Sequence, residues 1–162
     1  MQNAYDVVAD LAREIVPRGF NQYAHSPAAA SRLALHLAMA TGRPLFVGEA
    51  PTTRAQAVAF TDTSRSSDVF NRALGGHLVT RWNAWPFWQP IKPNAAELRR
   101  GSEYVRQVVD VTSPPCVYAV GRVAEKACRM VDVECRYLPH PGQDKAPLFV
   151  RQVDELVRKG LV

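Results

Sequence analysis

A short apolar run leads directly into a carboxylate at Pro44-Leu45-Phe46-Val47-Gly48-Glu49-Ala50-Pro51. An apolar run of this length that ends in glycine is typical of a strand buried in a parallel sheet. The carboxylate of Glu49 comes next, between a glycine and a proline that restrict where it can lie. We therefore predict a strand over residues 44–48 with a confined carboxylate at its carboxyl end.

Further strands and helices alternate outward from this segment. Three more apolar runs indicate strands at residues 78–80, 116–120 and 131–138. Helical spacing of apolar residues occurs at residues 3–16, 26–41, 67–75, 94–111, 121–130 and 144–159. Such alternation indicates right-handed crossovers and a parallel sheet covered on both faces. The sequence therefore predicts one α/β domain over residues 1–162, a three-layer α/β/α sandwich with a four-stranded parallel sheet.

The composition limits the classes of protein that fit. Hydrophobic residues make up 47% and charged residues 22% of the 162 residues, as in ordinary globular domains. No apolar stretch reaches the roughly 18 residues of a membrane helix, and the first residues lack the pattern of a signal peptide. We therefore expect a cytoplasmic protein without a membrane partner, and nothing in the sequence indicates an oligomer, so we expect a monomer.

The cysteines and histidines give no metal or cofactor pattern. The three cysteines form no C-x-x-C pair, which excludes a disulfide framework and a four-cysteine zinc or iron–sulfur site. The four histidines have no ligand-like spacing. Phosphate-loop, dinucleotide-binding and hydrolase-serine motifs are also missing. We expect neither a metal nor a cofactor.

The charge is modestly positive and dominated by arginine. The net charge is +5, and 16 of the 20 basic residues are arginines. Arginine pairs with phosphate through a planar fork, so a nucleic-acid partner fits this composition, as does a simple genomic bias towards arginine. The two halves of the chain carry similar net charge, so any basic patch must be built by the fold.

A chemically useful residue follows each predicted strand. Glu49 follows the first, Asn83 the second among several aromatic residues, Gly121 and Arg122 the third, and His140 the fourth between two prolines. Ligands of open parallel sheets bind beyond the carboxyl ends of the strands. Each residue alone is also explained by packing or turn formation. Their shared position predicts one site that combines an acid, an amide and a histidine.

The ordered motifs resemble the uracil-DNA glycosylase superfamily, in a bacterial branch without an iron–sulfur cluster. The similarity covers residues 20–160 and rests on Leu45 to Pro51, Asn83 before Pro86-Phe87, Ala119 to Ala127, and His140-Pro141. The segments 20–23 and 59–62 add weaker similarity. The resemblance implies a four-stranded parallel sheet between helices, which agrees with the fold predicted above.

The resemblance also implies roles for matched residues. Glu49 would activate the attacking water and stabilise positive charge on the deoxyribose. Phe60 would stack on the extruded base, Asn83 would read its Watson–Crick edge, and His140 would donate a hydrogen bond to the departing base. These roles fit the chemistry, because opposite charges develop on the sugar and on the base as the bond breaks.

Further positions would complete the site. Ala50, Pro51 and Thr52 would line the base pocket. Phosphates of DNA would bind near Gly121, Arg122, Gly142, Gln143 and Arg54. The family's usual glycine and serine are replaced here by Thr52 and Gly142, and the stretch between Phe60 and Asn83 is shorter than in the related branch. These departures affect the identity of the base more than the type of reaction.

The function predicted from these residues is that of a monofunctional DNA glycosylase. It would release uracil or a modified pyrimidine from DNA and leave an abasic site. It would be monofunctional because the motifs contain no lysine to form a Schiff base; Lys92 is the nearest, and we expect it to be solvated. Three alternatives stay open: an antiphage glycosylase that removes bulky, for example glucosylated, cytosines; an inactive DNA-binding member; and an enzyme on free nucleosides.

Overall fold

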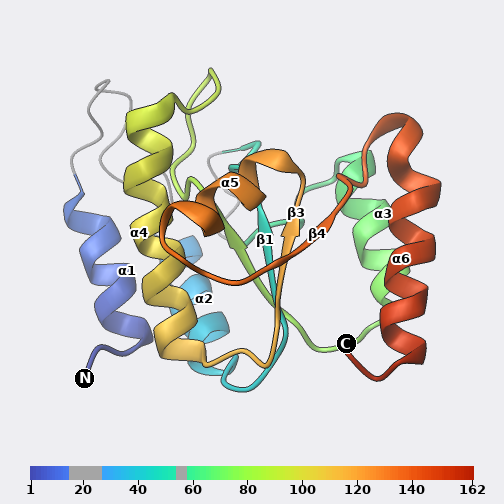
Figure 1. Cartoon of the computed structure of the whole chain (residues 1–162). Coiled ribbons are helices and arrows are strands. Elements are labelled where there is room, and N and C mark those ends of the chain that lie inside the picture. The colour runs from blue at the N-terminus through green and yellow to red at the C-terminus, as the bar shows by residue number, and fades with distance from the viewer. Residues whose placement is uncertain (15–26, 54–57) are drawn as a thin grey trace.

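All four strands of the structure, a computed structural model, run parallel. The structure describes residues 1–14, 27–53 and 58–162. The strands are β1 (Leu45–Gly48), β2 (Thr80–Asn83), β3 (Val117–Val120) and β4 (Arg136–Leu138), and their order across the sheet is β2-β1-β3-β4 (Figure 1). The predicted α/β fold with a four-stranded parallel sheet is confirmed. The central strand β1 pairs on both sides, with β2 and with β3.

Helices cover both faces of the sheet (Figure 1). One face packs against α1 (Ala4–Arg13), α2 (Pro27–Ala38), α4 (Ala95–Thr112) and α5 (Arg122–Met130). The other face packs against α3 (Arg65–Leu74) and α6 (Ala146–Arg158), and α6 is preceded by a 3₁₀ turn, η1 (Gln143–Lys145). The sheet therefore lies between two helical layers, with an apolar core on each side.

The alternation of side chains along β1 explains why this short strand organises the fold. Leu45 and Val47 are buried in the core that contains α1, α2, α4 and α5. Phe46 is buried in the opposite core, where its ring packs edge-on against Phe70 at a centroid distance of 5.4 Å. Successive side chains of a strand point to opposite faces. A continuous apolar run is thus required here, because both faces of the strand are buried.

Two predicted strands had wrong boundaries. The apolar run 78–80 was predicted as a strand, but Leu78 is 69% exposed and β2 extends from Thr80 to Asn83 in register with β1. The run 131–138 was predicted as another strand, but only Arg136–Leu138 pair with β3. The preceding residues form a turn in which Asp132 has a φ of 53°. Apolar composition alone therefore misplaced both strand starts.

The helix boundaries shift by a few residues for reasons visible in their caps. The Ser64 hydroxyl accepts a hydrogen bond from the Ser67 amide, so α3 begins before the predicted residue 67. The first helix ends at Arg13, because Glu14 is already extended with ψ of 132°. The predicted start of the second helix at residue 26 and the motif 20–23 lie outside the described residues.

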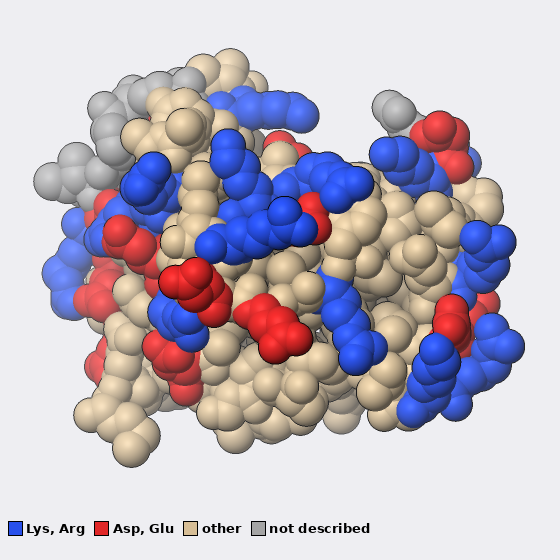
Figure 2. Space-filling model, in the orientation of Figure 1, with Lys and Arg blue, Asp and Glu red and all other residues tan. Residues whose placement is uncertain are grey.

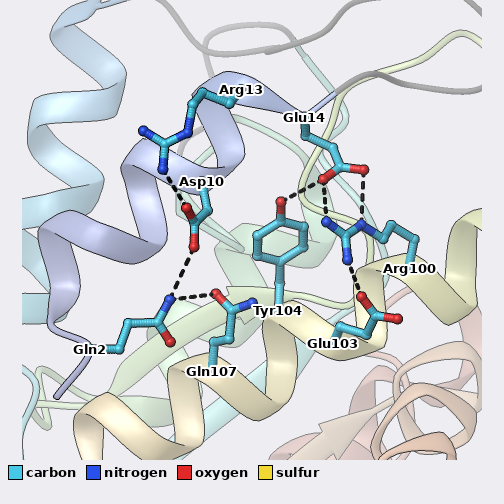
Figure 3. Close-up of polar contacts among 8 residues, drawn as sticks. All are labelled: Gln2, Asp10, Arg13, Glu14, Arg100, Glu103, Tyr104 and Gln107. Atoms are coloured by element: carbon cyan, nitrogen blue, oxygen red, sulfur yellow. Dashed lines mark hydrogen bonds and ion pairs between the residues drawn. The ribbon is translucent and has the colours of Figure 1, made fainter.

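Side chains of α1 and α4 form a polar network between these helices (Figure 3). The Arg100 guanidinium donates two hydrogen bonds to the Glu14 carboxylate, at 2.9 and 2.7 Å, and the Tyr104 hydroxyl donates a third at 2.8 Å. Glu14 is largely buried, with 12% of its side chain exposed. These bonds lower the pKa of Glu14, chiefly through Arg100 and against the opposing effect of burial. The network fixes the end of α1 against α4.

Histidine 36 protects the free edge of β2. The Arg81 amide of β2 donates a hydrogen bond of 2.9 Å to Nε2 of His36 on α2. Covering an edge amide in this way removes a donor that could pair with another strand. Burial, together with the positive charges of Arg81 and Arg43, lowers the pKa of His36 to about 4. His36, in an alanine- and leucine-rich helix, therefore has a structural role.

No helix in the described part of the chain is long and apolar enough to cross a membrane.

Protonation of His36 should destabilise the fold in acid. Between its folded pKa of about 4 and its ordinary value of 6.5, the unfolded chain binds the extra proton, so stability falls as pH falls through this window. We expect His36→Gln, which keeps an acceptor, to remove about 2–3 kcal/mol of that pH-dependent loss in denaturant unfolding. The exposed His77→Gln is the control and should keep the wild-type slope. An unchanged slope in His36→Gln would contradict this assignment.

Candidate active site

A cavity of about 380 Å³ lies where the carboxyl ends of the strands meet. Seven residues singled out from the sequence line it together: Glu49, Ala50, Pro51, Thr52, Phe60, Asn83 and His140. They come from the segments after β1, β2 and β4, far apart along the chain. Parallel strands place their carboxyl ends at one edge of the sheet, which explains the convergence.

Asn83 is the most buried polar side chain among these seven residues. It is the last residue of β2, pairs in register with Gly48, and is 5% exposed. None of the described residues makes a hydrogen bond to its side-chain amide. Its Oδ1 lies 3.1 Å from the point where a Cβ on Gly48 would be, so a side chain at this position would press on the amide. A buried amide without a protein partner is suited to bind the polar edge of a ligand.

Phe60 supplies an aromatic wall to the cavity. Its ring stacks on Phe70 with a centroid distance of 4.1 Å and an interplanar angle of 8°. Phe70 covers one face, so only the opposite face and the edge are left to line the cavity. The backbone of Phe60 has an unusual φ of 59°. Its carbonyl accepts hydrogen bonds from the side chains of Asn71 and Arg81, which hold the residue in this conformation.

His140 is held with one ring nitrogen oriented as a donor. The Gly142 amide donates a hydrogen bond of 3.1 Å to Nδ1 of His140. Because Nδ1 is an acceptor, the neutral ring carries its proton on Nε2. Desolvation by the surrounding protein lowers the pKa of His140 below its ordinary value; the charge of Glu49 opposes this shift and that of Lys92 adds to it. His140 is therefore a neutral hydrogen-bond donor at pH 7.

Glu49 and Lys92 bring opposite charges to the mouth of the cavity. Nζ of Lys92 lies 3.9 Å from Oε1 of Glu49. The lysine side chain is 86% exposed, as expected for a solvated lysine, whereas that of Glu49 is 31% exposed. Local sequence does not place this lysine at the site, because the loop 89–93 reaches the cavity only through the tertiary fold.

Another part of the lining, the hydroxyl wall, is rich in hydroxyl groups and was not predicted. It consists of Asp62, Ser64, Ser66 and Ser67, next to Thr52. In the sequence, residues 61–67 look like an ordinary loop and helix cap, so their composition did not distinguish them. Thr52 was expected to line the base pocket, but its hydrogen-bond partner was not predicted. In the structure the Thr52 hydroxyl donates a hydrogen bond to the Asp62 carboxylate.

The residues expected to bind phosphate lie around the cavity rather than in its lining. A Cβ on Gly142 would lie 3.0 Å from Nδ1 of His140, and a Cβ on Gly121 would be in ordinary van der Waals contact with the His140 side chain. Arg122 is exposed, forms an ion pair with Glu125 at 2.9 Å, and lies over the Tyr137 ring at 4.2 Å. Gln143 begins the turn η1, and Arg54 lies outside the described residues. Of the five positions, Gly121 and Gly142 thus lie next to His140. Arg122 already contacts Glu125 and Tyr137.

The described residues contain no group of three or more His, Cys, Asp or Glu side chains arranged to hold a metal ion.

No protein-family model matches this chain, and no curated protein matches it with statistical significance. The resemblance of its motifs to a glycosylase superfamily therefore rests on the residues themselves.

The charges at the cavity mouth give a prediction for His140. In nuclear magnetic resonance titrations we expect its pKa below 6.5 in the wild-type protein. Glu49→Gln removes the charge that raises this pKa and should lower it further, whereas Lys92→Met should raise it. Glu134→Gln, at an exposed position outside the cavity lining, is the control. Shifts of the opposite sign, or no shift in either variant, would contradict the arrangement.

Proposed function

We propose that the protein is a monofunctional DNA glycosylase that hydrolyses the N-glycosidic bond of uracil or a modified pyrimidine and leaves an abasic site. The observation that carries the proposal is the convergence of a carboxylate, a buried amide, an aromatic ring and a neutral histidine donor on one cavity. These are the groups that such a reaction requires. The motif resemblance supports the same reaction.

The charges of the site match those that develop during the reaction. As the glycosidic bond breaks, the sugar acquires positive charge and the departing base acquires negative charge. Glu49 would stabilise the sugar and orient the attacking water. The Nε2–H group of His140 would donate a hydrogen bond to a base oxygen. Groups that are fixed before the reaction stabilise a transition state without reorganisation. The hydrogen bond from the Gly142 amide to Nδ1 fixes the His140 ring in this way.

The cavity is suited to a base that has left the duplex. Enzymes that act on a base extrude it into a pocket, stack it on an aromatic side chain and read its polar edge. Phe60 would provide the stacking surface and Asn83 both a donor and an acceptor for the Watson–Crick edge. Asn83 has no protein partner among the described residues, so a bound base would satisfy its buried amide.

Basic side chains gather on one face of the molecule near this end. In Figure 2 a band of Lys and Arg crosses the upper part of the visible face, towards the carboxyl ends of the strands in Figure 1. DNA phosphates bind such surfaces through release of counterions, so affinity should fall with salt. The band supports DNA as the partner.

Substitution of the two catalytic candidates tests the proposal. In single-turnover release of uracil from an oligonucleotide, we expect Glu49→Gln and His140→Ala each to lower the rate by about 100-fold or more. Glu134→Gln and His77→Ala, at exposed positions outside the cavity lining, are matched controls and should keep the wild-type rate. Circular dichroism verifies folding. Wild-type rates in folded Glu49→Gln and His140→Ala would refute the assignment.

Lys92 makes the monofunctional assignment testable. A Schiff base requires the amine to attack the sugar, whereas Nζ of Lys92 pairs with the Glu49 carboxylate at 3.9 Å and the lysine side chain is 86% exposed. We therefore expect no covalent protein–DNA complex when borohydride is added during turnover, and an abasic strand that stays intact. A trapped complex that disappears in Lys92→Met would show strand-cleaving chemistry instead.

A further inference from the structure

The hydroxyl-rich wall of the cavity is built around one carboxylate. Oδ1 of Asp62 accepts hydrogen bonds from the hydroxyls of Ser64, at 2.8 Å, and Ser67, and Oδ2 accepts one from Thr52. Burial raises the pKa of Asp62, but the hydrogen bonds from Ser67, Thr52 and Ser64 together outweigh it and lower the pKa below its ordinary value. Asp62 is therefore ionised at neutral pH.

The direction of these bonds decides what the wall offers to a ligand. A hydroxyl has one proton to donate and two lone pairs to accept with. The hydroxyls of Thr52, Ser64 and Ser67 each donate to Asp62, and Ser64 Oγ also lies 3.2 Å from Ser67 Oγ. With these protons directed to one another and to the carboxylate, the surface that the four side chains form consists mainly of acceptors. A carbonyl oxygen placed against it would be repelled. A ligand group that donates a hydrogen bond would be bound.

The wall is in contact with the rest of the site. Ser66 Oγ lies 3.0 Å from the point where a Cβ on Gly142 would be, and His140 Nδ1 lies at the same distance from that point. The hydroxyl wall thus extends from Thr52, after β1, to the loop that holds His140. The Asn83 side chain lines the same cavity and makes no hydrogen bond to any described residue.

The dimensions leave room for more than an unsubstituted base. The cavity of about 380 Å³ falls within the range of about 300–1,000 Å³ typical of sites for drug-sized ligands. A pyrimidine stacked on Phe60 with its Watson–Crick edge on Asn83 has position 5 on its other edge. A substituent there would extend away from Asn83, and the rest of the cavity lining includes Thr52, Asp62 and Ser67.

We propose that Asp62, with Thr52, Ser64 and Ser67, forms a subsite for a hydroxyl-bearing substituent at position 5 of the pyrimidine. The proposal rests on the proposed function for its choice of ligand. It names the substrate class more closely: bases with a hydroxymethyl group or a larger hydroxylated substituent, in preference to uracil or thymine. A hydrogen bond to a charged acceptor discriminates by about 10- to 100-fold, which sets the preference expected.

Two oligonucleotides that differ by one hydroxyl test the subsite. Thymine and 5-hydroxymethyluracil, each placed opposite guanine, are compared in single-turnover base release and in binding by fluorescence anisotropy. We expect the wild-type protein to favour 5-hydroxymethyluracil by at least about tenfold. Asp62→Asn should reduce this preference to about threefold or less, because an amide no longer directs all three hydroxyl protons inward. Asp154→Asn, exposed on α6, is the matched control.

A second variant tests the subsite if Asp62→Asn does not fold. Thr52→Val keeps the shape of the side chain and removes one hydroxyl, and it should also reduce the preference. Equal release and equal binding of the two oligonucleotides by the wild-type protein would overturn the subsite, whether or not uracil is released. A binding preference that Asp62→Asn removes, with no base released from any DNA, would support the subsite and refute the glycosylase reaction.

Discussion

Gly48 ends the central strand without a side chain, and Asn83 and Phe60 pack against the space that a side chain would fill. A Cβ there would lie 3.1 Å from Asn83 Oδ1 and 3.2 Å from the Phe60 ring. The amide and the ring can therefore reach the same cavity as Glu49, the next residue along the chain. The position of β1 between β2 and β3 fixes this contact, because hydrogen bonds hold the strand on both sides.

The charges around the cavity are separated in a way that suits bond cleavage. Glu49 and Lys92 lie at the mouth, 3.9 Å apart. The neutral ring of His140 is fixed by the Gly142 amide, and Asp62 is surrounded by hydroxyl donors on another wall. The His140 ring and the Asp62 carboxylate are therefore held by hydrogen bonds before any ligand arrives. Preorganisation of this kind is the main way in which a protein site stabilises developing charge.

The sequence was sufficient for the parallel sheet and for the cluster of Glu49, Asn83 and His140, because alternating strands and helices determine which ends of the strands meet. It was insufficient for the start of β2, since apolar Leu78 faces solvent, and for the start of β4, where a turn at Asp132 replaces the expected strand. Lys92 and the Asp62 wall could not be anticipated. Their approach to the cavity depends on how loops fold over the sheet, and local composition carries no signal for that.

Release of free base from DNA tests the central claim most directly. The wild-type protein, in excess, would be incubated with oligonucleotides that contain uracil, hypoxanthine, hydroxymethylcytosine or glucosylated hydroxymethylcytosine, and the products separated by chromatography. The account predicts at least one free pyrimidine base, together with an intact abasic strand. No free base from any of these DNAs, with folded protein and measurable DNA binding, would contradict it and leave a binding protein in its place.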